Sequence, residues 1–528
     1  MCAARFWPHA VRHLDIRRGF RVLAAVLVVA LAAVVTPGPA AAADVTGRPD
    51  LEAIEAFVTS QLDRHRIPGA TLAVIDGGAV VRTAAVGDAA EGEPMTADEP
   101  MPIGSVTKTF TAVAVLQLVE RGRLALDAPV RDYLPWFSVD DPSASAEITI
   151  RHLLNQTSGL SEGGYNRVLA EETSLEDGVR DLRRARPTAE VGSRHQYFNP
   201  NYAVLALVVE NVSGQSYGTY LADHVLEPLG MVDTYAEDPR TVGGTIAQGH
   251  RKMFGYPVAV QHRYDRWRVG ADGVISTAPD LARLAIALSG DGAVDGARIL
   301  NRRSVELMWT SHDVAGDPYG FGWVTGEHAG ARVGGHAGAD PAFSAELAVL
   351  PDQDRGYVLL MNSDHLLDLM VAVPQLRVGM LDLLQGRAAP AGGLSMATVG
   401  AATLLLTLVA AAFAVRSARK VRGWTDRASA MSTRQLFRAV APQFLVPALV
   451  WLAVYQLSPV LTDGRAFNLG YVGRYYVPDL VILLAVATVP DVVQGVYMLV
   501  SAMRVRHRSP PSVTVVPVDA ARPVHSAR

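Results

Sequence analysis

Three apolar stretches in the C-terminal third of the chain, at about 396–415, 440–461 and 477–503, place the strongest constraint on its fold. As an α-helix, each stretch is long enough to cross about 30 Å of hydrocarbon. Backbone N–H and C=O groups must bond to one another inside a bilayer, so such stretches are expected to be helical. The sequence therefore predicts that residues 391–508 form three transmembrane helices, with the lipid bilayer as a partner.

The distribution of arginine predicts how these helices are oriented. The loop between the first two stretches and the segment after the third are rich in arginine, whereas the remaining loop holds only Arg465 and Arg474. Basic loops are preferentially retained in the cytoplasm. We therefore expect a multi-pass protein of the cell membrane, with a cytoplasmic tail at 509–528 and residues 44–390 on the extracytoplasmic side.

The N-terminus supports the same orientation. Residues 1–43 combine five arginines, an apolar run and a cluster of alanines, which is typical of a secretory signal peptide. The pair Arg17-Arg18 resembles the core of a twin-arginine signal. An uncleaved anchor helix is the alternative interpretation. Cys2 is the only cysteine, so an intramolecular disulfide is excluded.

Hydrophobic spacing in residues 44–390 predicts one α+β domain. Strand patterns lie near both ends, and the middle, from 105 to about 300, is mostly helical in pattern. This order favours an antiparallel sheet flanked by helices, with an inserted mostly helical lobe and a site between the two. The predicted elements are a helix at 51–62, a hairpin of 71–75 and 79–86 around Asp76-Gly77-Gly78, a hairpin of 343–350 and 357–361, and a helix at 364–384.

Ser105 and Lys108 are the strongest candidates for catalysis. Of 48 Lys and Arg residues, only Lys108, Lys252 and Lys420 are lysines. A buried lysine can lose its proton and act as a base, which arginine cannot do near neutral pH. Ser105 and Lys108 lie three residues apart at the start of an apolar helical run, so their side chains are expected to be neighbours. The pattern predicts a serine nucleophile activated by lysine, and a simple N-cap serine is the alternative.

Two other serines match nucleophile patterns less well. Ser417 and Lys420 repeat the spacing, but they lie in the basic loop beside a predicted membrane helix. The segment 214–218 fits the G-x-S-x-G pattern around Ser216, which requires a preceding buried strand. Residues 202–211 are instead helical in pattern, and the glycines after them are typical of a helix end. We therefore favour Ser105.

Three motifs in order, together with the sequences that flank them, resemble the class C β-lactamase and penicillin-binding-protein-like family of serine hydrolases. They are Ser105-Val106-Thr107-Lys108, Tyr197-Phe198-Asn199 and His336-Ala337-Gly338, within a match over roughly 50–385. The resemblance implies a β-lactamase/transpeptidase-like fold and an acyl-enzyme on Ser105. It assigns proton transfer to Lys108 and Tyr197.

The same resemblance implies the substrate-binding residues. Asn199 would hydrogen-bond Lys108 and the substrate amide, while His336 and Gly338 would lie on the strand that lines the site. The N–H groups of Ser105 and Ala339 would form the oxyanion hole. No metal and no cofactor are expected. The net charge of −4 and the lack of a basic aromatic patch argue against a nucleic-acid partner.

One residue departs from the family pattern. Related β-lactamases and D-Ala carboxypeptidases usually carry lysine at the position of His336, and neutral imidazole attracts a substrate carboxylate less than ammonium does. We therefore expect a small-molecule or peptide substrate, as an ester, amide or D-amino-acid peptide, rather than efficient β-lactamase activity. Two alternatives remain: a catalytically weak binding or sensor module that signals through its membrane helices, and a transporter-like protein.

Overall fold

The computed structural model describes residues 48–165, 167–311, 318–461, 473 and 476–508. The predicted signal peptide at 1–43 and the tail at 509–528 lie outside the described residues. The chain divides into two compact units. The first contains the residues up to Leu406 together with Tyr455–Val481, and the second contains Thr407–Val454 and the residues from Ile482 onward.

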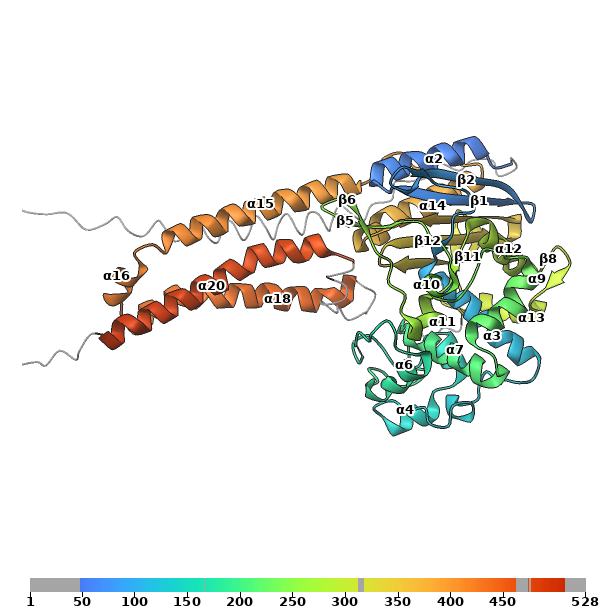
Figure 1. Ribbon diagram of the computed structural model, residues 1–528, viewed down its shortest axis with the longest axis horizontal. Helices are drawn as coiled ribbons and strands as arrows, with labels where there is room; N and C mark the ends of the chain where they lie inside the picture. The colour runs from blue at the N-terminus through green and yellow to red at the C-terminus, as the bar shows by residue number, and fades with distance from the viewer. Residues whose placement is uncertain (1–47, 166, 312–317, 462–472, 474–475, 509–528) are drawn as a thin grey trace, which may run out of the picture. The chain divides into compact units, whose positions relative to one another are not determined.

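A seven-stranded antiparallel sheet forms the framework of the first unit (Figure 1). β1 pairs with β13, with Ala70 opposite Met361, so strands from both ends of the domain meet inside the sheet. Both predicted hairpins are confirmed. The β1–β2 turn uses Gly77 and Gly78 at φ of 62° and 72°, a conformation that glycine adopts without steric cost. In spatial order the strands are β10 (Val324–His328), β11 (Ala331–Asp340), β12 (Phe343–Leu350), β13 (Arg355–Met361), β1 (Gly69–Asp76), β2 (Ala79–Ala90) and β3 (Glu93–Pro94).

Two helices, α2 (Leu51–His65) and α14 (Val373–Leu384), cover one face of this sheet (Figure 1). Their apolar side chains, such as Ile54 and Leu376, form one core with those of β1 and β13. The helix predicted at 364–384 begins later than expected. Ser363–Asp364 form a short strand, β14, and a π-helical turn precedes α14.

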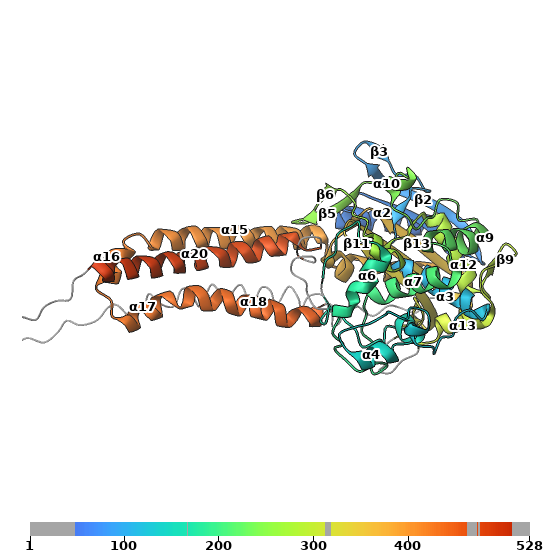
Figure 2. The ribbon, with the colours of Figure 1, turned by 60° about the horizontal axis from the view of Figure 1, so that its bottom comes forward.

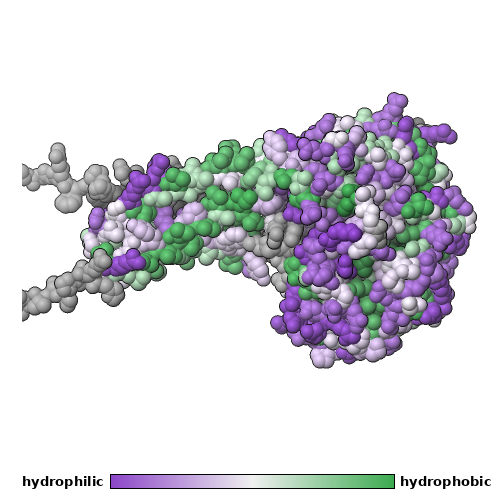
Figure 3. All heavy atoms as spheres, viewed as in Figure 1, coloured by the Kyte–Doolittle hydropathy of each residue, from purple (hydrophilic) through white to green (hydrophobic). Residues whose placement is uncertain are grey.

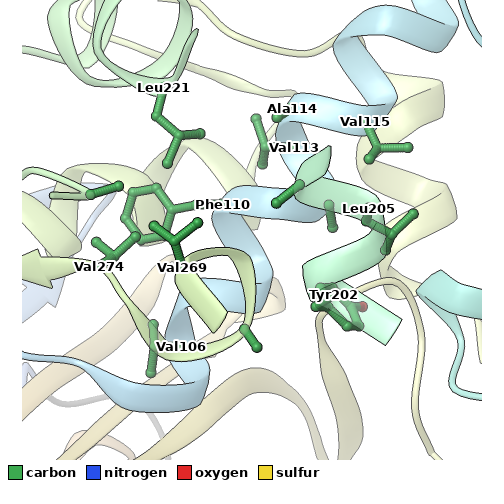
Figure 4. Close-up of a cluster of buried hydrophobic side chains, with 14 of the residues drawn as sticks. Val106, Phe110, Val113, Ala114, Val115, Tyr202, Leu205, Leu221, Val269 and Val274 are labelled. Atoms are coloured by element: carbon green, nitrogen blue, oxygen red, sulfur yellow. The ribbon is translucent and has the colours of Figure 1, made fainter. Parts of the chain in front are cut away.

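The other face of the sheet is covered by the inserted helical lobe. The main helices are α3 (Thr107–Glu120), α7 (Pro200–Ser213), α11 (Val269–Asp272) and α12 (Ala278–Ser289). Phe110 of α3 lies beside Val269 of α11, Val274 and Leu221 in a cluster of buried hydrophobic side chains (Figure 4). Residues 107–118 of α3 are all buried, so this helix is held on every side. Such enclosure fixes the position of whatever side chains its first turn carries.

One part of the middle segment is not helical, contrary to expectation. Residues 249–260 form a hairpin of β5 (Gly249–Met253) and β6 (Tyr256–Val260), and β5 also pairs in parallel with β14. The alternation of exposed and buried positions is short here, so periodicity alone did not separate the hairpin from its helical surroundings.

The shorter elements connect this framework, and α6 lies beside α7 in the lobe (Figure 2). They are β4 (Met101–Pro102), η1 (Gly104–Val106), η2 (Val130–Asp132), α4 (Pro142–Glu147), α5 (Ile150–Leu154), α6 (Leu175–Asp181), η3 (Leu182–Arg184), α8 (Tyr217–Leu221), η4 (Ala222–Leu226), α9 (Glu227–Leu229), α10 (Pro239–Val242), η5 (Arg266–Arg268), β7 (Ile275–Ser276), β8 (Ala293–Val294), β9 (Ala297–Arg298), α13 (Arg302–Trp309), η6 (Pro351–Gln353) and η7 (Asp368–Ala372).

Among the residues that the structure describes, three helices are long and apolar enough to cross a membrane: Met396–Arg419, Thr433–Gln456 and Pro478–Arg506. Figure 3 shows hydrophobic residues along them. They agree with the three predicted spans, although the second begins several residues earlier. The spans lie in α15 (Met396–Lys420), in α17 (Thr433–Val440) with α18 (Pro442–Leu461), and in α20 (Pro478–Arg508), and α16 (Trp424–Ser429) lies between the first two. The predicted fold class is confirmed.

Candidate active site

Ser105 and Lys108 are brought together where the sheet meets helix α3. Ser105 is half-buried in the turn η1, and Lys108 lies fully buried in the first turn of α3. The Lys108 Nζ donates hydrogen bonds to Ser105 Oγ at 2.9 Å and to the Ala271 carbonyl at 2.8 Å. The predicted proximity of the two side chains is therefore present in the structure, and the carbonyl at the end of α11 holds the amine in place.

The environment of Lys108 favours a neutral amine. Burial lowers the pKa of Lys108, because the charged form loses its hydration, and Arg268 lowers it further. Tyr197 and Asp272 act in the opposite direction and raise the same pKa. A lysine with a lowered pKa can accept a proton from the serine hydroxyl beside it.

Tyr197 reaches this pair from the inserted lobe. Lys108 Nζ lies 5.0 Å from the centre of the Tyr197 ring, and a hydrogen bond between the two side chains contributes to the pKa of the lysine. Gln156 fixes the loop on both sides of the tyrosine. Its carbonyl accepts from Gln196 N at 2.8 Å, and its Oε1 accepts from Phe198 N at 3.1 Å.

Asn199 does not make the bond to Lys108 that the family resemblance implied. It caps the N-terminus of α7 with its backbone, and its Oδ1 is buried without a hydrogen-bond partner among the described residues. Lys108 instead donates to Ser105 and to Ala271. The main-chain carbonyl of Ala271 thus accepts from the amine, while Asn199 Oδ1 has no hydrogen-bond partner among the described residues.

His336 and a residue that the sequence analysis missed, Tyr319, form one contact. His336 is buried on β11, with Nδ1 2.6 Å from the Ala337 carbonyl and Nε2 3.2 Å from the Tyr319 hydroxyl. The Tyr319 ring also lies edge-on to that of Tyr197, at 5.9 Å between centroids. Burial raises the pKa of Tyr319 well above its usual value, so the phenol keeps its proton. The sequence signal for it is Tyr319-Gly320-Phe321-Gly322-Trp323, an aromatic and glycine alternation.

Gly338 and Ala339 bring the edge of β11 against the turn that carries Ser105. A Cβ on Gly338 would lie 2.0 Å from the Ile103 carbonyl oxygen and 3.3 Å from Ser105 N. A Cβ on Gly104 would lie 2.8 Å from Ala339 N. Glycine at both places lets the backbone of residues 338–339 lie directly against that of residues 103–105.

A carboxylic acid close to Lys108, Asp272, also escaped the sequence analysis. Asp272 follows Ala271 at the end of α11 and is hydrogen-bonded to Arg268. Burial raises the pKa of Asp272 to about 6, while Arg268 and Lys108 act to lower it. A single carboxylate in a helical segment has no distinctive sequence pattern, and only the tertiary structure places it beside Lys108.

The competing serines have other roles. Gly214 ends α7 in the left-handed conformation at φ of 80°, and Ser216 caps α8 by accepting from Thr219 N. No buried strand precedes Ser216, since α7 does. Ser417 donates to Gln494 Oε1 at 3.0 Å. Within the described residues, no group of three or more His, Cys, Asp or Glu side chains is arranged to hold a metal ion.

Sequence comparisons find similar proteins over the same region. The chain is 32% identical over 318 residues to penicillin-binding protein 4 of Amycolatopsis lactamdurans, a match that covers 56% of this chain and 81% of that protein. It is 28% identical to protein flp of Staphylococcus aureus, covering 58% of this chain and 62% of flp, which is less than two thirds of that relative's length.

Solved structures give the same result. The octameric penicillin-binding protein homologue from Pyrococcus abyssi aligns with a TM-score of 0.56 and 25% identity, over 64% of this chain and 78% of that one. A structure of a protein named SurE aligns with a TM-score of 0.53 and 27% identity, over 65% and 77%. The family model described as Beta-lactamase matches residues 54–378. This chain therefore belongs to the β-lactamase family.

Proposed function

We propose that this chain is a membrane-anchored serine hydrolase that works through an acyl-enzyme on Ser105. The pair Ser105 and Lys108 carries the proposal. Their 2.9 Å contact and the lowered pKa of the buried lysine are what a hydroxyl needs in order to lose its proton without a histidine.

The proposed reaction has two halves. Ser105 Oγ attacks the substrate carbonyl carbon while its proton passes to the Lys108–Tyr197 pair. Neutral Lys108 accepts it from the serine, and Tyr197 shares it as the second base through its hydrogen bond to the lysine. That proton then goes to the leaving alcohol or amine as its bond to the acyl carbon breaks. Water attacks the resulting serine ester and gives a proton to the same pair. The pair returns that proton to Ser105 Oγ as its bond to the acyl carbon breaks and the acid is released.

Backbone and side-chain groups around the pair support the remaining roles. The N–H groups of Ser105 and Ala339 are proposed to stabilise the oxyanion, a role worth about 3 kcal/mol for one donor in other hydrolases. Asn199 Oδ1, buried and unpaired among the described residues, is proposed to accept the N–H of a substrate amide. An unpaired buried acceptor is costly in itself, so a substrate donor at this place gains binding energy.

The proposed substrates are esters, amides or D-amino-acid peptides. His336 occupies a place where a lysine would attract a substrate carboxylate, and both of its ring nitrogens are already in contact with Ala337 and Tyr319. A neutral ring so engaged offers little attraction to an anion. Turnover of a chromogenic cephalosporin and of a short-chain p-nitrophenyl ester tests this choice. Faster turnover of the cephalosporin contradicts it.

Membrane attachment completes the proposal. Residues 391–508 would anchor domain 44–390 on the extracytoplasmic side, after removal of signal peptide 1–43, and tail 509–528 would be cytoplasmic. The three apolar helices support the attachment, and the arginine-rich loop supports the orientation. Accessibility of single introduced cysteines to an impermeant reagent in intact cells tests it.

Covalent labelling of the full chain tests the nucleophile. A fluorophosphonate probe is expected to label the wild type and a Ser216→Ala control, but not Ser105→Ala. Labelling of Ser105→Ala at the wild-type level contradicts the assignment. No labelling of the wild type, together with no hydrolysis of esters or D-amino-acid peptides, favours the sensor-module alternative.

A further inference from the structure

A small hairpin of the hydrolase domain rests directly on the first turn of a candidate membrane helix. The β5–β6 turn consists of Phe254 and Gly255, at φ of 52° and 77°. A Cβ on Gly255 would lie 2.8 Å from the Met396 carbonyl oxygen, and one on Gly400 would lie 2.2 Å from the Phe254 carbonyl carbon. The turn and α15 therefore meet backbone to backbone, which glycine on both sides permits.

The same turn is joined to the start of a second candidate membrane helix. Phe254 N donates to Asp479 Oδ2 at 3.2 Å, in the first turn of α20. Asp479 Oδ1 lies 3.1 Å from His365 Nε2, and both side chains are almost fully buried. The hairpin turn is thus fixed against the beginnings of α15 and α20 by packing and by hydrogen bonds.

This contact determines the depth of the hairpin relative to the bilayer. Gly400 is four residues into the span that begins at Met396, or about 6 Å along a helix. The span of 24 residues is about 36 Å long, about 6 Å more than the roughly 30 Å hydrocarbon layer, and with this excess at the end next to the hydrolase domain its first turn lies in the interfacial region. The Phe254–Gly255 turn lies at the same level.

The side chains that the hairpin exposes fit that location. Tyr256 and Val258 alternate along β6 and are 57% and 48% exposed. The guanidinium of Arg66 lies 4.0 Å above the centre of the Tyr256 ring. Tyrosine with a neighbouring cation is the pairing enriched at membrane interfaces, where the ring contacts acyl chains and the cation meets lipid phosphate.

We propose that the hairpin surface, formed by Tyr256, Val258 and Arg66, lies in the lipid headgroup layer and binds it. This contact rests on the membrane anchoring proposed above and adds a second attachment of the hydrolase domain to the bilayer. The hairpin is also connected to the candidate active site through β11. Arg251 of β5 donates to the Pro341 carbonyl at 3.1 Å, in the turn directly after the β11 strand that carries Ala339.

Site-directed fluorescence in lipid tests the proposal on the full chain. Cys2 is the only native cysteine, so Cys2→Ser gives a background for single cysteines. Val258→Cys is labelled with an environment-sensitive dye in phosphatidylcholine–phosphatidylglycerol vesicles that contain lipid bearing a nitroxide near the headgroup. Val232→Cys is the matched control, because it is 85% exposed and follows α9 on the opposite side of the domain from β6 (Figures 1 and 2).

We expect the label at Val258 to shift to shorter wavelength and to lose intensity to the nitroxide lipid, and the label at Val232 to do neither. Adding Tyr256→Ser and Arg66→Gln should reduce the quenching at Val258. Equal signals at the two positions overturn the proposal. A label at Leu405→Cys, in the α15 span, separates the two ideas. Quenching at Leu405 but not at Val258 contradicts the hairpin contact alone. Absence of quenching at both positions contradicts the membrane anchoring as well.

Discussion

The hydroxyl of Tyr319 lies 3.2 Å from Nε2 of His336, a residue of β11, the strand that lies against the turn of Ser105. Because the Ala337 carbonyl can only accept, His336 Nδ1 carries a proton. In a neutral ring Nε2 is then the acceptor for the Tyr319 hydroxyl. The two contacts therefore hold the His336 ring in one tautomer and one orientation.

Removing that hydroxyl should impair catalysis without unfolding the domain. We expect Tyr319→Phe to lower kcat/KM for a p-nitrophenyl ester about fivefold, since one net hydrogen bond is worth about 1 kcal/mol. Tyr165→Phe is the control, because that buried hydroxyl bonds Asp181 in the lobe instead. Equal losses in the two variants would show that the effect is structural.

A charge at position 336 should change substrate preference. His336→Lys places an ammonium where related β-lactamases carry one, and a charge-assisted hydrogen bond to a substrate carboxylate is worth about 1.5 kcal/mol or more. The ratio of kcat/KM for a cephalosporin to that for a neutral ester should therefore rise about tenfold. An unchanged ratio contradicts the role given to His336.

Gly338 should tolerate no side chain. In Gly338→Ala the new Cβ would meet the Ile103 carbonyl at 2.0 Å and push β11 away from the Ser105 turn. We expect about a hundredfold loss in kcat, as for loss of one oxyanion donor, and a lower melting temperature. Gly326→Ala, on β10 with nothing within 4 Å of its Cβ, is the matched control and should retain activity. A fully active Gly338→Ala contradicts the proposed oxyanion hole.

Asp272 should control the acid limb of the pH–rate profile. Its negative charge raises the pKa of Lys108, so Asp272→Asn should lower that pKa further. The lysine then becomes neutral at a lower pH, and the acid limb of kcat/KM should move to lower pH. Measuring kcat/KM for a neutral ester between pH 4 and pH 9 checks this. A shift to higher pH contradicts the electrostatic role.

His65 should make the domain sensitive to acid. It is fully buried in α2, and burial, followed by the charges of Lys252 and Arg64, lowers its pKa from 6.5 to about 4. Below pH 6.5 this histidine binds a proton in the unfolded chain, whereas in the folded chain it binds one only below about pH 4. Stability is therefore lost as the pH falls through this window, by up to about 3 kcal/mol.

Melting temperatures of wild type and His65→Phe across that range test the expectation. The wild type should melt at progressively lower temperature from pH 6.5 to pH 4, and the variant should show a shallower decline. Parallel curves for the two proteins would assign the acid sensitivity to other groups.

The elements that could be predicted from sequence are those with strong local signals. Asp76-Gly77-Gly78 marks the β1–β2 turn because glycine permits its positive φ, and the alternating residues on each side match the strands. The spacing of Ser105 and Lys108 predicts their contact because a helical turn fixes it. The three spans follow from length and apolarity alone.

The features that escaped prediction depend on contacts between distant segments. Tyr319 contacts His336 because β11 places the histidine next to it. Asp272 lies close to Lys108 because α11 packs against α3. The expected bond from Asn199 to Lys108 is replaced by the carbonyl of Ala271, a main-chain group that every residue type supplies. Side-chain patterns carry no information about such a choice.

The pairing of β1 with β13 has a consequence for biogenesis. Ala70 meets Met361, so the strand synthesised first in the domain has no partner on this side until nearly the whole domain has been made. Until then it presents an open edge that other chains can join. Ribosomal stalling or proteolysis anywhere between the two strands would leave a fragment with that edge exposed, and such fragments should depend on chaperones or be degraded.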